Sequence, residues 1–127
     1  MIEDTVIKKK PITSFRDLDV YQNTYHSMLI VMKDVVEKLP SSEKYDLRDQ
    51  LSRSCKAVPR LIAEGYAKRH QKMGFQKYLD DAMAETNETI VSLEQCRYIY
   101  NLDEKLINNL VKEYDICGRQ LYKLTIA

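Results

Sequence analysis

The stretch from Leu47 to Arg69, LRDQLSRSCKAVPRLIAEGYAKR, constrains the fold of this chain more than any other segment. Apolar or small residues recur along it at steps of three and four, which is the spacing of one side of an α-helix. These residues are Leu47, Leu51, Ser54, Val58, Leu61 and Gly65. Pro59 interrupts the helical hydrogen bonds because it has no backbone N–H, so we expect it to bend the helix. Ser54 and Gly65 are small where a core stripe usually carries leucine, which predicts the close approach of another backbone. A functional hinge at Pro59 and Gly65 is the alternative interpretation.

Three further segments carry the same helical spacing. Ser14 stands three residues before Asp17 in a pattern like a capping box, and Pro40 stops the helix that begins there. Ser41 and Ser42 are candidate caps for the second helix. The predicted core stripe of the first helix consists of Leu18, Tyr21, Tyr25, Met28, Met32, Val35 and Leu39. The stripe of the third helix consists of Phe75, Leu79, Ala82, Thr86, Thr89, Leu93 and Cys96. The stripe of the fourth helix consists of Leu106, Leu110, Tyr114, Cys117, Leu121 and Leu124.

Short polar connections separate these helices. Residues 70–74 end in glycine and predict one turn, and residues 101–103 predict another, with Asp103 able to cap the last helix. Helices joined by short connections lie antiparallel to one another. The sequence therefore predicts an all-α fold, an up-down-up-down antiparallel four-helix bundle over residues 14–127. Residues 1–13 lack periodicity, and we expect a flexible N-terminal arm there.

Charge is unevenly distributed along the chain, although the formal net charge is only +1. Residues 44–77 contain nine Lys/Arg and three Asp/Glu, a surplus of +6, whereas residues 78–115 contain three Lys/Arg and nine Asp/Glu, a surplus of −6. The near-neutral total thus conceals a dipolar molecule, which suits binding to a charged partner or to an oppositely charged part of another copy.

Signals for catalysis are missing from the sequence. It has no glycine-rich phosphate loop, no Gly-x-Ser-x-Gly and no Glu-x-x-His pair of a di-iron bundle. The cysteines Cys55, Cys96 and Cys117 are far apart, and we expect buried thiols in a reducing compartment rather than a metal or redox centre. We therefore expect no enzyme activity, catalytic residue, cofactor, metal site or small-molecule substrate. No apolar run is long enough to span a membrane, and no targeting segment is recognisable, so the expected location is the cytoplasm.

Cations gather on the side of the second helix that lies opposite its apolar stripe. At 100° per residue, Arg53, Lys56 and Arg60 fall within about 60° of one another, and no aromatic residue of the same helix lies between them. The complete set of candidate nucleic-acid-binding residues is Arg48, Arg53, Lys56, Arg60, Lys68, Arg69 and Lys72. Such a row can follow the phosphates of a nucleic acid.

Two other interpretations of this row remain open. It can be an ordinary solvated face, since exposed helices generally carry spaced charges. It can also complement the acidic stripe of Asp81, Glu85 and Glu88 on the third helix, within one subunit or between subunits.

Three segments resemble a known family: FRDLDVYQ (15–22), LPSSEKYDLRDQLSRS (39–54) and VPRLIAEGYAKR (58–69). They are similar to the small bundle proteins encoded in intervening sequences of bacterial 23S ribosomal RNA genes, also called S23 or four helix bundle proteins. The most specific piece is the spacing of Gln50, Leu51, Arg53 and Ser54, followed by Val58-Pro59 and Ile62-Ala63-Glu64-Gly65. The chain also resembles the accessory variability proteins of diversity-generating retroelements, which share this fold.

The resemblance implies a homopentamer. For the retroelement accessory proteins, it also implies binding of nucleic acid and of a reverse transcriptase through a basic surface. We therefore expect a non-enzymatic oligomer that presents its basic residues to RNA or an RNA–DNA intermediate, as an accessory to a reverse transcriptase or a ribosomal RNA element. The alternative is a homo-oligomeric scaffold whose basic and acidic stripes serve self-assembly or a protein partner.

Overall fold

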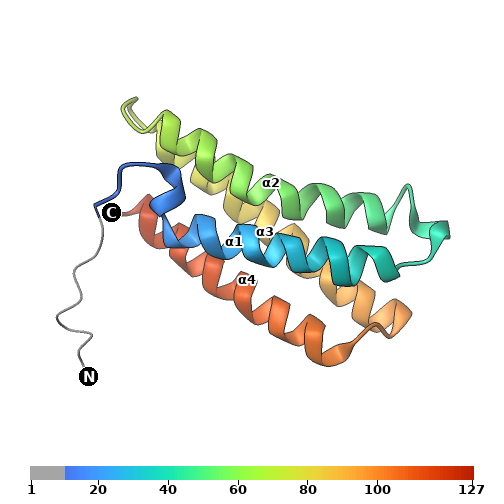
Figure 1. The fold of residues 1–127 in the computed structure, drawn as a ribbon. Coiled ribbons are helices and arrows are strands. Elements are labelled where there is room, and N and C mark those ends of the chain that lie inside the picture. The colour runs from blue at the N-terminus through green and yellow to red at the C-terminus, as the bar shows by residue number, and fades with distance from the viewer. Residues whose placement is uncertain (1–10) are drawn as a thin grey trace, which may run out of the picture.

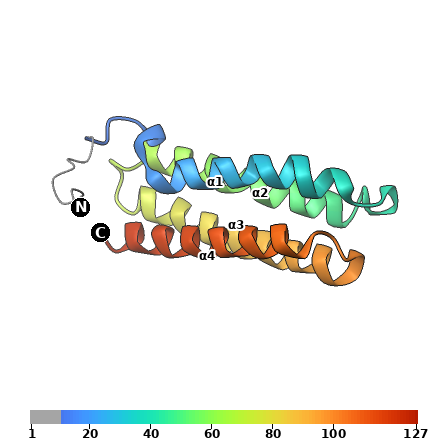
Figure 2. The same cartoon turned by 60° about the horizontal axis from the view of Figure 1, so that its bottom comes forward.

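Residues 11–127 are described by the computed structural model, and they form a bundle of four antiparallel helices. The helices are α1 (Asp19–Ile30), α2 (Leu47–Ala67), α3 (Gly74–Tyr100) and α4 (Glu104–Thr125). Each helix packs against the next along the chain, and α4 packs back against α1. Figure 2 shows α1 and α2 as one layer over α3 and α4. The start of α1, the C-terminus and the α2–α3 turn lie at one end of the bundle (Figure 1).

This architecture confirms the all-α, up-down-up-down prediction. Residues 11–13 have no regular secondary structure, and the rest of the predicted N-terminal arm, residues 1–10, lies outside the described residues.

The first helical segment is more irregular than the sequence predicts. Ser14 and Asp17 form the expected capping box, but it caps a short 3₁₀ turn, η1 (Phe15–Asp17), and α1 begins after it. Beyond α1 the chain continues through a π-helical segment, η2 (Val31–Val35), and a 3₁₀ turn, η3 (Val36–Lys38). A further 3₁₀ turn, η4 (Ser41–Glu43), precedes α2.

The core stripe of α1 is shifted by one residue from the prediction. The buried positions from α1 into η2 are Val20, Thr24, Ser27 and Val31, whereas the prediction placed Tyr21, Tyr25, Met28 and Met32 there. Tyr25 is 44% exposed, so its assignment to the core is wrong, and Tyr21 is only partly buried. Tyr114, by contrast, is fully buried as predicted.

Two physical effects account for the shift. The Thr24 hydroxyl donates a hydrogen bond to the Val20 carbonyl at 2.8 Å, so burying this side chain leaves no hydroxyl unpaired. Burying a tyrosine hydroxyl without a hydrogen-bond partner would instead cost free energy. The extra residue of the η2 turn, where the N–H of Val36 bonds to the carbonyl of Val31, then advances the register. As a result, Val35 and Leu39 are buried as predicted.

The helices α2 and α3 approach each other closely at Gly65. A Cβ added at Gly65 would lie 2.7 Å from the Cβ of Tyr78 and 3.1 Å from Cδ1 of Phe75. At the second small position, the Thr89 hydroxyl donates a hydrogen bond to the buried Ser54 hydroxyl at 2.9 Å. The expected close approach of a neighbouring backbone is therefore confirmed at Gly65, whereas Ser54 meets the side chain of Thr89.

The beginnings of α2 and α4 are capped differently. Neither Ser41 nor Ser42 caps α2; the Glu43 carboxylate accepts a hydrogen bond from the Leu47 N–H at 3.0 Å instead. This correction follows from η4, which places the serines before the helix proper. Asp103 caps α4 as predicted, accepting from the Leu106 N–H at 3.1 Å.

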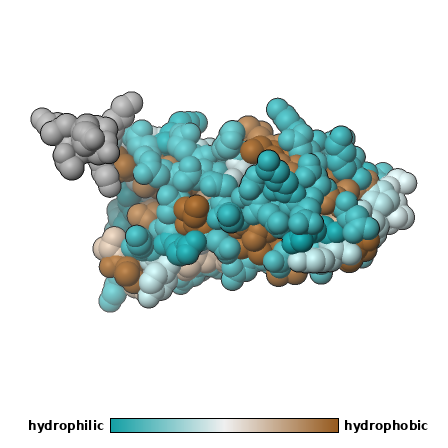
Figure 3. All heavy atoms as spheres, turned by 90° about the horizontal axis from the view of Figure 1, so that it is seen from below, coloured by the Kyte–Doolittle hydropathy of each residue, from teal (hydrophilic) through white to brown (hydrophobic). Residues whose placement is uncertain are grey.

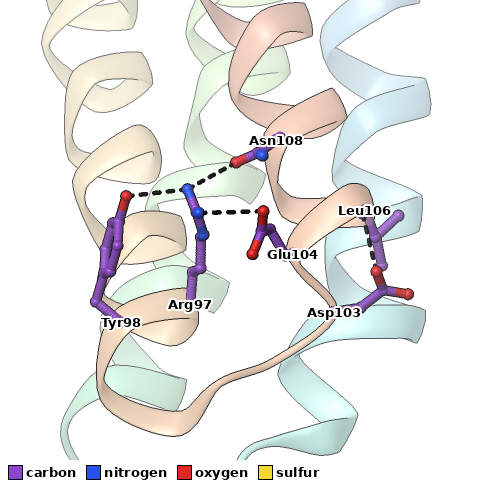
Figure 4. A network of polar contacts seen from close by, with 6 residues as sticks. All are labelled: Arg97, Tyr98, Asp103, Glu104, Leu106 and Asn108. Atoms are coloured by element: carbon purple, nitrogen blue, oxygen red, sulfur yellow. Dashed lines mark hydrogen bonds and ion pairs between the residues drawn. The ribbon is translucent and has the colours of Figure 1, made fainter.

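Arg97 fastens α3 to α4 near their connection (Figure 4). Its guanidinium donates to the Tyr98 hydroxyl at 2.9 Å and to Asn108 Oδ1 at 3.1 Å, and it lies 3.3 Å from a Glu104 carboxylate oxygen. Asn101 turns the chain between the two helices with a φ of 53°. The Arg97 cation is thus engaged in the fold itself.

The three cysteines are buried free thiols, as expected. Burial raises the pKa of Cys55 to about 12, that of Cys96 to about 11 and that of Cys117 to about 12, which keeps all three protonated at neutral pH. Among the helices of residues 11–127, none is long and apolar enough to cross a membrane.

Candidate nucleic-acid interface

Three of the predicted cations line one groove between α2 and α3. Arg53, Lys56 and Arg60 are exposed on α2, and the groove that they line has a volume of about 890 Å³. A helix rises about 1.5 Å per residue, so the row extends roughly 10 Å along the axis. Arg48, nearer the start of α2, is half-buried and does not line this groove. The sequence therefore identified a real cluster but included residues outside it.

The opposite wall of this α2–α3 groove is acidic. Glu85 and Glu88 of α3 line it, together with neutral polar side chains. Partial burial raises the pKa of Glu85, and the nearby Glu88 carboxyl adds to the effect, while Arg53 acts against it. The predicted basic row and two members of the predicted acidic stripe thus share a groove within one subunit, whereas Asp81 does not line it.

The cations of the row are nevertheless not neutralised across the groove. Arg53 pairs with Asp49 on its own helix at 3.3 Å, an exposed pair of small energetic value. Within residues 11–127, Lys56 and Arg60 form neither an ion pair nor a side-chain hydrogen bond. Two of the three charges therefore remain available to an outside anion.

A second groove lies on the other side of the same cations, between α1 and α2. Lys56 and Arg60 line it as well, so these two side chains stand between the two grooves. The remaining lining is mostly apolar and includes Tyr21 and Tyr25 of α1. Its volume is about 290 Å³. We call this the aromatic groove; the residues that line it are Phe15, Tyr21, Tyr25, Met28, Lys56, Pro59, Arg60 and Ala63.

The aromatic groove was missed because the tyrosines come from a different helix from the cations. On α2 alone no aromatic residue interleaves with the basic row, as the sequence indicates. A signal was present in the i, i+4 pair of Tyr21 and Tyr25, but the same spacing also suits a core stripe. Only the packing of α1 against α2 decides between the two.

The remaining predicted cations lie at the α2–α3 turn. The Lys68 ammonium donates to the Tyr78 hydroxyl at 2.8 Å, which raises the pKa of Lys68. The Arg69 guanidinium lies 3.9 Å from the ring centroid of Tyr66. Lys72 is exposed in the turn. These residues extend the positive charge to the end of the bundle, as predicted, but they line neither groove.

The other side of the bundle offers a different surface. Figure 3 shows the molecule from below the view of Figure 1, on the side away from α2. This face is largely hydrophilic, and its hydrophobic patches are separate from one another.

No group of three or more His, Cys, Asp or Glu side chains within residues 11–127 is arranged to hold a metal ion.

Two comparisons with known proteins bear on the identity of this chain. Curated proteins give no significant match to this chain. The sequence profile of the family described as 23S rRNA-intervening sequence protein, however, matches residues 16–123. The match extends from η1 through nearly all of α4, the whole of the bundle apart from its ends. Because the match covers most of the chain, the chain belongs to the 23S rRNA-intervening sequence protein family.

Proposed function

We propose that this protein is a non-enzymatic, cytoplasmic RNA-binding accessory factor that works as a homo-oligomer. Its phosphate-binding surface is the row of Arg53, Lys56 and Arg60 on α2, extended by the cations of the α2–α3 turn. The observation that carries the proposal is that Lys56 and Arg60 are exposed and unpaired within residues 11–127, although acidic side chains line the same groove.

The lack of pairing favours an outside anion over a purely internal role for the charges. A basic stripe that served the packing of its own subunit would engage Glu85 or Glu88 directly, as Arg97 engages Glu104 elsewhere in the bundle. The family description, which refers to 23S rRNA, is consistent with an RNA ligand. The resemblance noted from the sequence extends the proposal to a pentamer, to RNA–DNA as a ligand and to a reverse transcriptase as a protein partner.

The salt dependence of binding tests the proposal. For a single strand, the logarithm of affinity falls with the logarithm of salt with a slope of about −0.7 per phosphate neutralised. Three cations per subunit then predict a loss of about 20-fold between roughly 50 and 200 mM salt. Fluorescence anisotropy with a labelled structured RNA, a single strand and a DNA duplex measures this slope.

The deciding variant is the triple change Arg53→Glu, Lys56→Glu and Arg60→Glu. Its matched control reverses three exposed cations elsewhere, Lys33→Glu, Lys38→Glu and Lys123→Glu, with the same change in net charge. We expect the first variant to lose binding and the control to keep most of it. Wild-type protein that binds no nucleic acid at the lower salt would refute the proposal.

The same variants address the alternative function as a scaffold, which the presence of basic and acidic side chains in one open groove favours. Light scattering after size-exclusion chromatography gives the mass of each assembly. A triple variant that loses its oligomeric state would assign the cations to self-assembly. A triple variant that keeps its mass but loses RNA would assign them to RNA.

A further inference from the structure

We propose that the aromatic groove between α1 and α2 binds unpaired bases of the RNA strand whose phosphates contact Lys56 and Arg60. This inference rests on the proposed function and adds a ligand class to it, single-stranded rather than duplex RNA.

The first argument is the exposure of Tyr25 and, in part, of Tyr21, whose spacing would also have suited the core stripe of α1. Tyr25 is 44% exposed, and its ring lies 5.8 Å from that of Tyr21, tilted by 37°. Phe15 contacts Tyr21 edge to face, with 4.9 Å between the ring centroids, and so supports the Tyr21 ring. A supported, partly exposed aromatic cluster is the kind of platform on which bases stack, whatever their sequence.

The second argument is the position of the cations. Lys56 and Arg60 line both the aromatic groove and the α2–α3 groove. The bases of a strand whose phosphates contact these two cations could therefore enter either groove. Glu85 and Glu88 make the α2–α3 groove unfavourable for further phosphates. The strand is therefore expected to lie over α2, with its bases directed toward α1.

The third argument is size. The aromatic groove, at about 290 Å³, falls at the lower end of the range of ligand pockets, roughly 300–1,000 Å³. That volume suits a base or two but not a folded domain. Bases within a duplex are stacked on their neighbours, whereas those of single-stranded loops and ends can turn onto a protein ring. A preference for single strands follows.

Tyr25→Ala tests the inference on the complete chain. We expect the affinity for an unstructured uridine-rich oligonucleotide of about 12 nucleotides to fall at least about fivefold, the lower limit for losing one base–aromatic stack. The salt slope should stay unchanged because no cation is removed. Tyr25→Trp should retain binding, and affinity for a blunt RNA duplex should not respond to either change.

Tyr122→Ala is the control, since Tyr122 is 57% exposed on α4, away from the groove. Single-strand binding by Tyr25→Ala equal to that of wild type, with binding still lost in the triple charge variant, would overturn the groove and leave the proposed function intact. Wild-type protein that binds no RNA would overturn both. Loss of the oligomer in Tyr25→Ala would identify the groove as a contact between copies and also overturn the inference.

Discussion

Replacing Gly65 by alanine is the sharpest test of how α2 and α3 pack. The new Cβ would lie 2.7 Å from the Cβ of Tyr78, whereas carbon atoms are in favourable contact at about 3.5–4.0 Å. The Cβ of Tyr78 is attached directly to the backbone and cannot turn away. The helices must therefore separate locally by roughly 1 Å, and overpacking of this kind costs about 1–3 kcal/mol.

A second glycine supplies the matched control. Gly118 also lies inside a helix, but a Cβ added there would meet only Cγ2 of Thr86 at 4.0 Å, an ordinary contact. Alanine is favoured over glycine within helices by about 1 kcal/mol, and both substitutions gain this term. We expect Gly118→Ala to stabilise the fold by about 0.5–1 kcal/mol. The same gain offsets part of the clash at Gly65, so Gly65→Ala should be destabilised by up to about 2 kcal/mol, and the two variants should differ by the overpacking cost, about 1–3 kcal/mol.

Urea unfolding followed by far-ultraviolet circular dichroism measures both values. All samples should have one protein concentration, since any self-association contributes to the apparent stability. The slope of free energy against urea should be unchanged, so that a shift in midpoint reports stability alone. A Gly65→Ala protein as stable as Gly118→Ala would refute the packing argument, because the same gain in helix propensity would then be opposed by no clash.

Three further predictions concern buried or perturbed polar groups. Tyr114→Phe should raise the urea midpoint, because within residues 11–127 the fully buried Tyr114 hydroxyl has no hydrogen-bond partner; a lower midpoint would contradict this. The hydrogen bond from the Tyr100 hydroxyl lowers the pKa of Glu43 from its ordinary 4.5, so its stabilisation is present above that pH and lost as the pH falls. Glu43→Gln should therefore be less stable than wild type at pH 7 and differ little near pH 3, and an equal deficit at both would count against the hydrogen bond. Burial and the proximity of Glu88 raise the pKa of Glu85, so the contribution of protonated Glu85 to folding stability is present below pH 4.5 and lost as the pH rises. Glu85→Gln should therefore be more stable than wild type at pH 7 but not at pH 4, which urea unfolding at the two pH values would show.

Most of the bundle could be predicted from the spacing of its apolar residues. The stripes of α3 and α4 each follow one series of three- and four-residue steps, and most of their members are buried. For α1 two adjacent series compete, one led by Tyr21 and Tyr25 and the other by Val20 and Thr24. Hydrophobicity favours the first, but the buried hydroxyl of Thr24 is satisfied by its own helix, a local bond that periodicity does not reveal.

The candidate interface was partly predictable for a related reason. Charges on one helix can be placed on a wheel, so the row of Arg53, Lys56 and Arg60 was accessible from the sequence. Predicting the aromatic groove requires knowing how α1 is rotated about its own axis relative to α2. That rotation depends on which of the two series of α1 is buried. An error of one residue in α1 therefore concealed both the exposed tyrosine and its proximity to the cations.

The η2 turn gives the first helical segment two independent phases. Up to Val31 its inward side is set by small and β-branched residues, and beyond the extra residue it is set by Val35 and Leu39. Deleting one residue within η2 would remove the π turn and rotate one half of the segment by about 100° relative to the other. Val20 and Thr24 before the turn are as deeply buried as Val35 and Leu39 after it, so one of the two sets would have to leave the core. The single extra residue of this turn thus lets both sets reach the core while Tyr25 stays exposed.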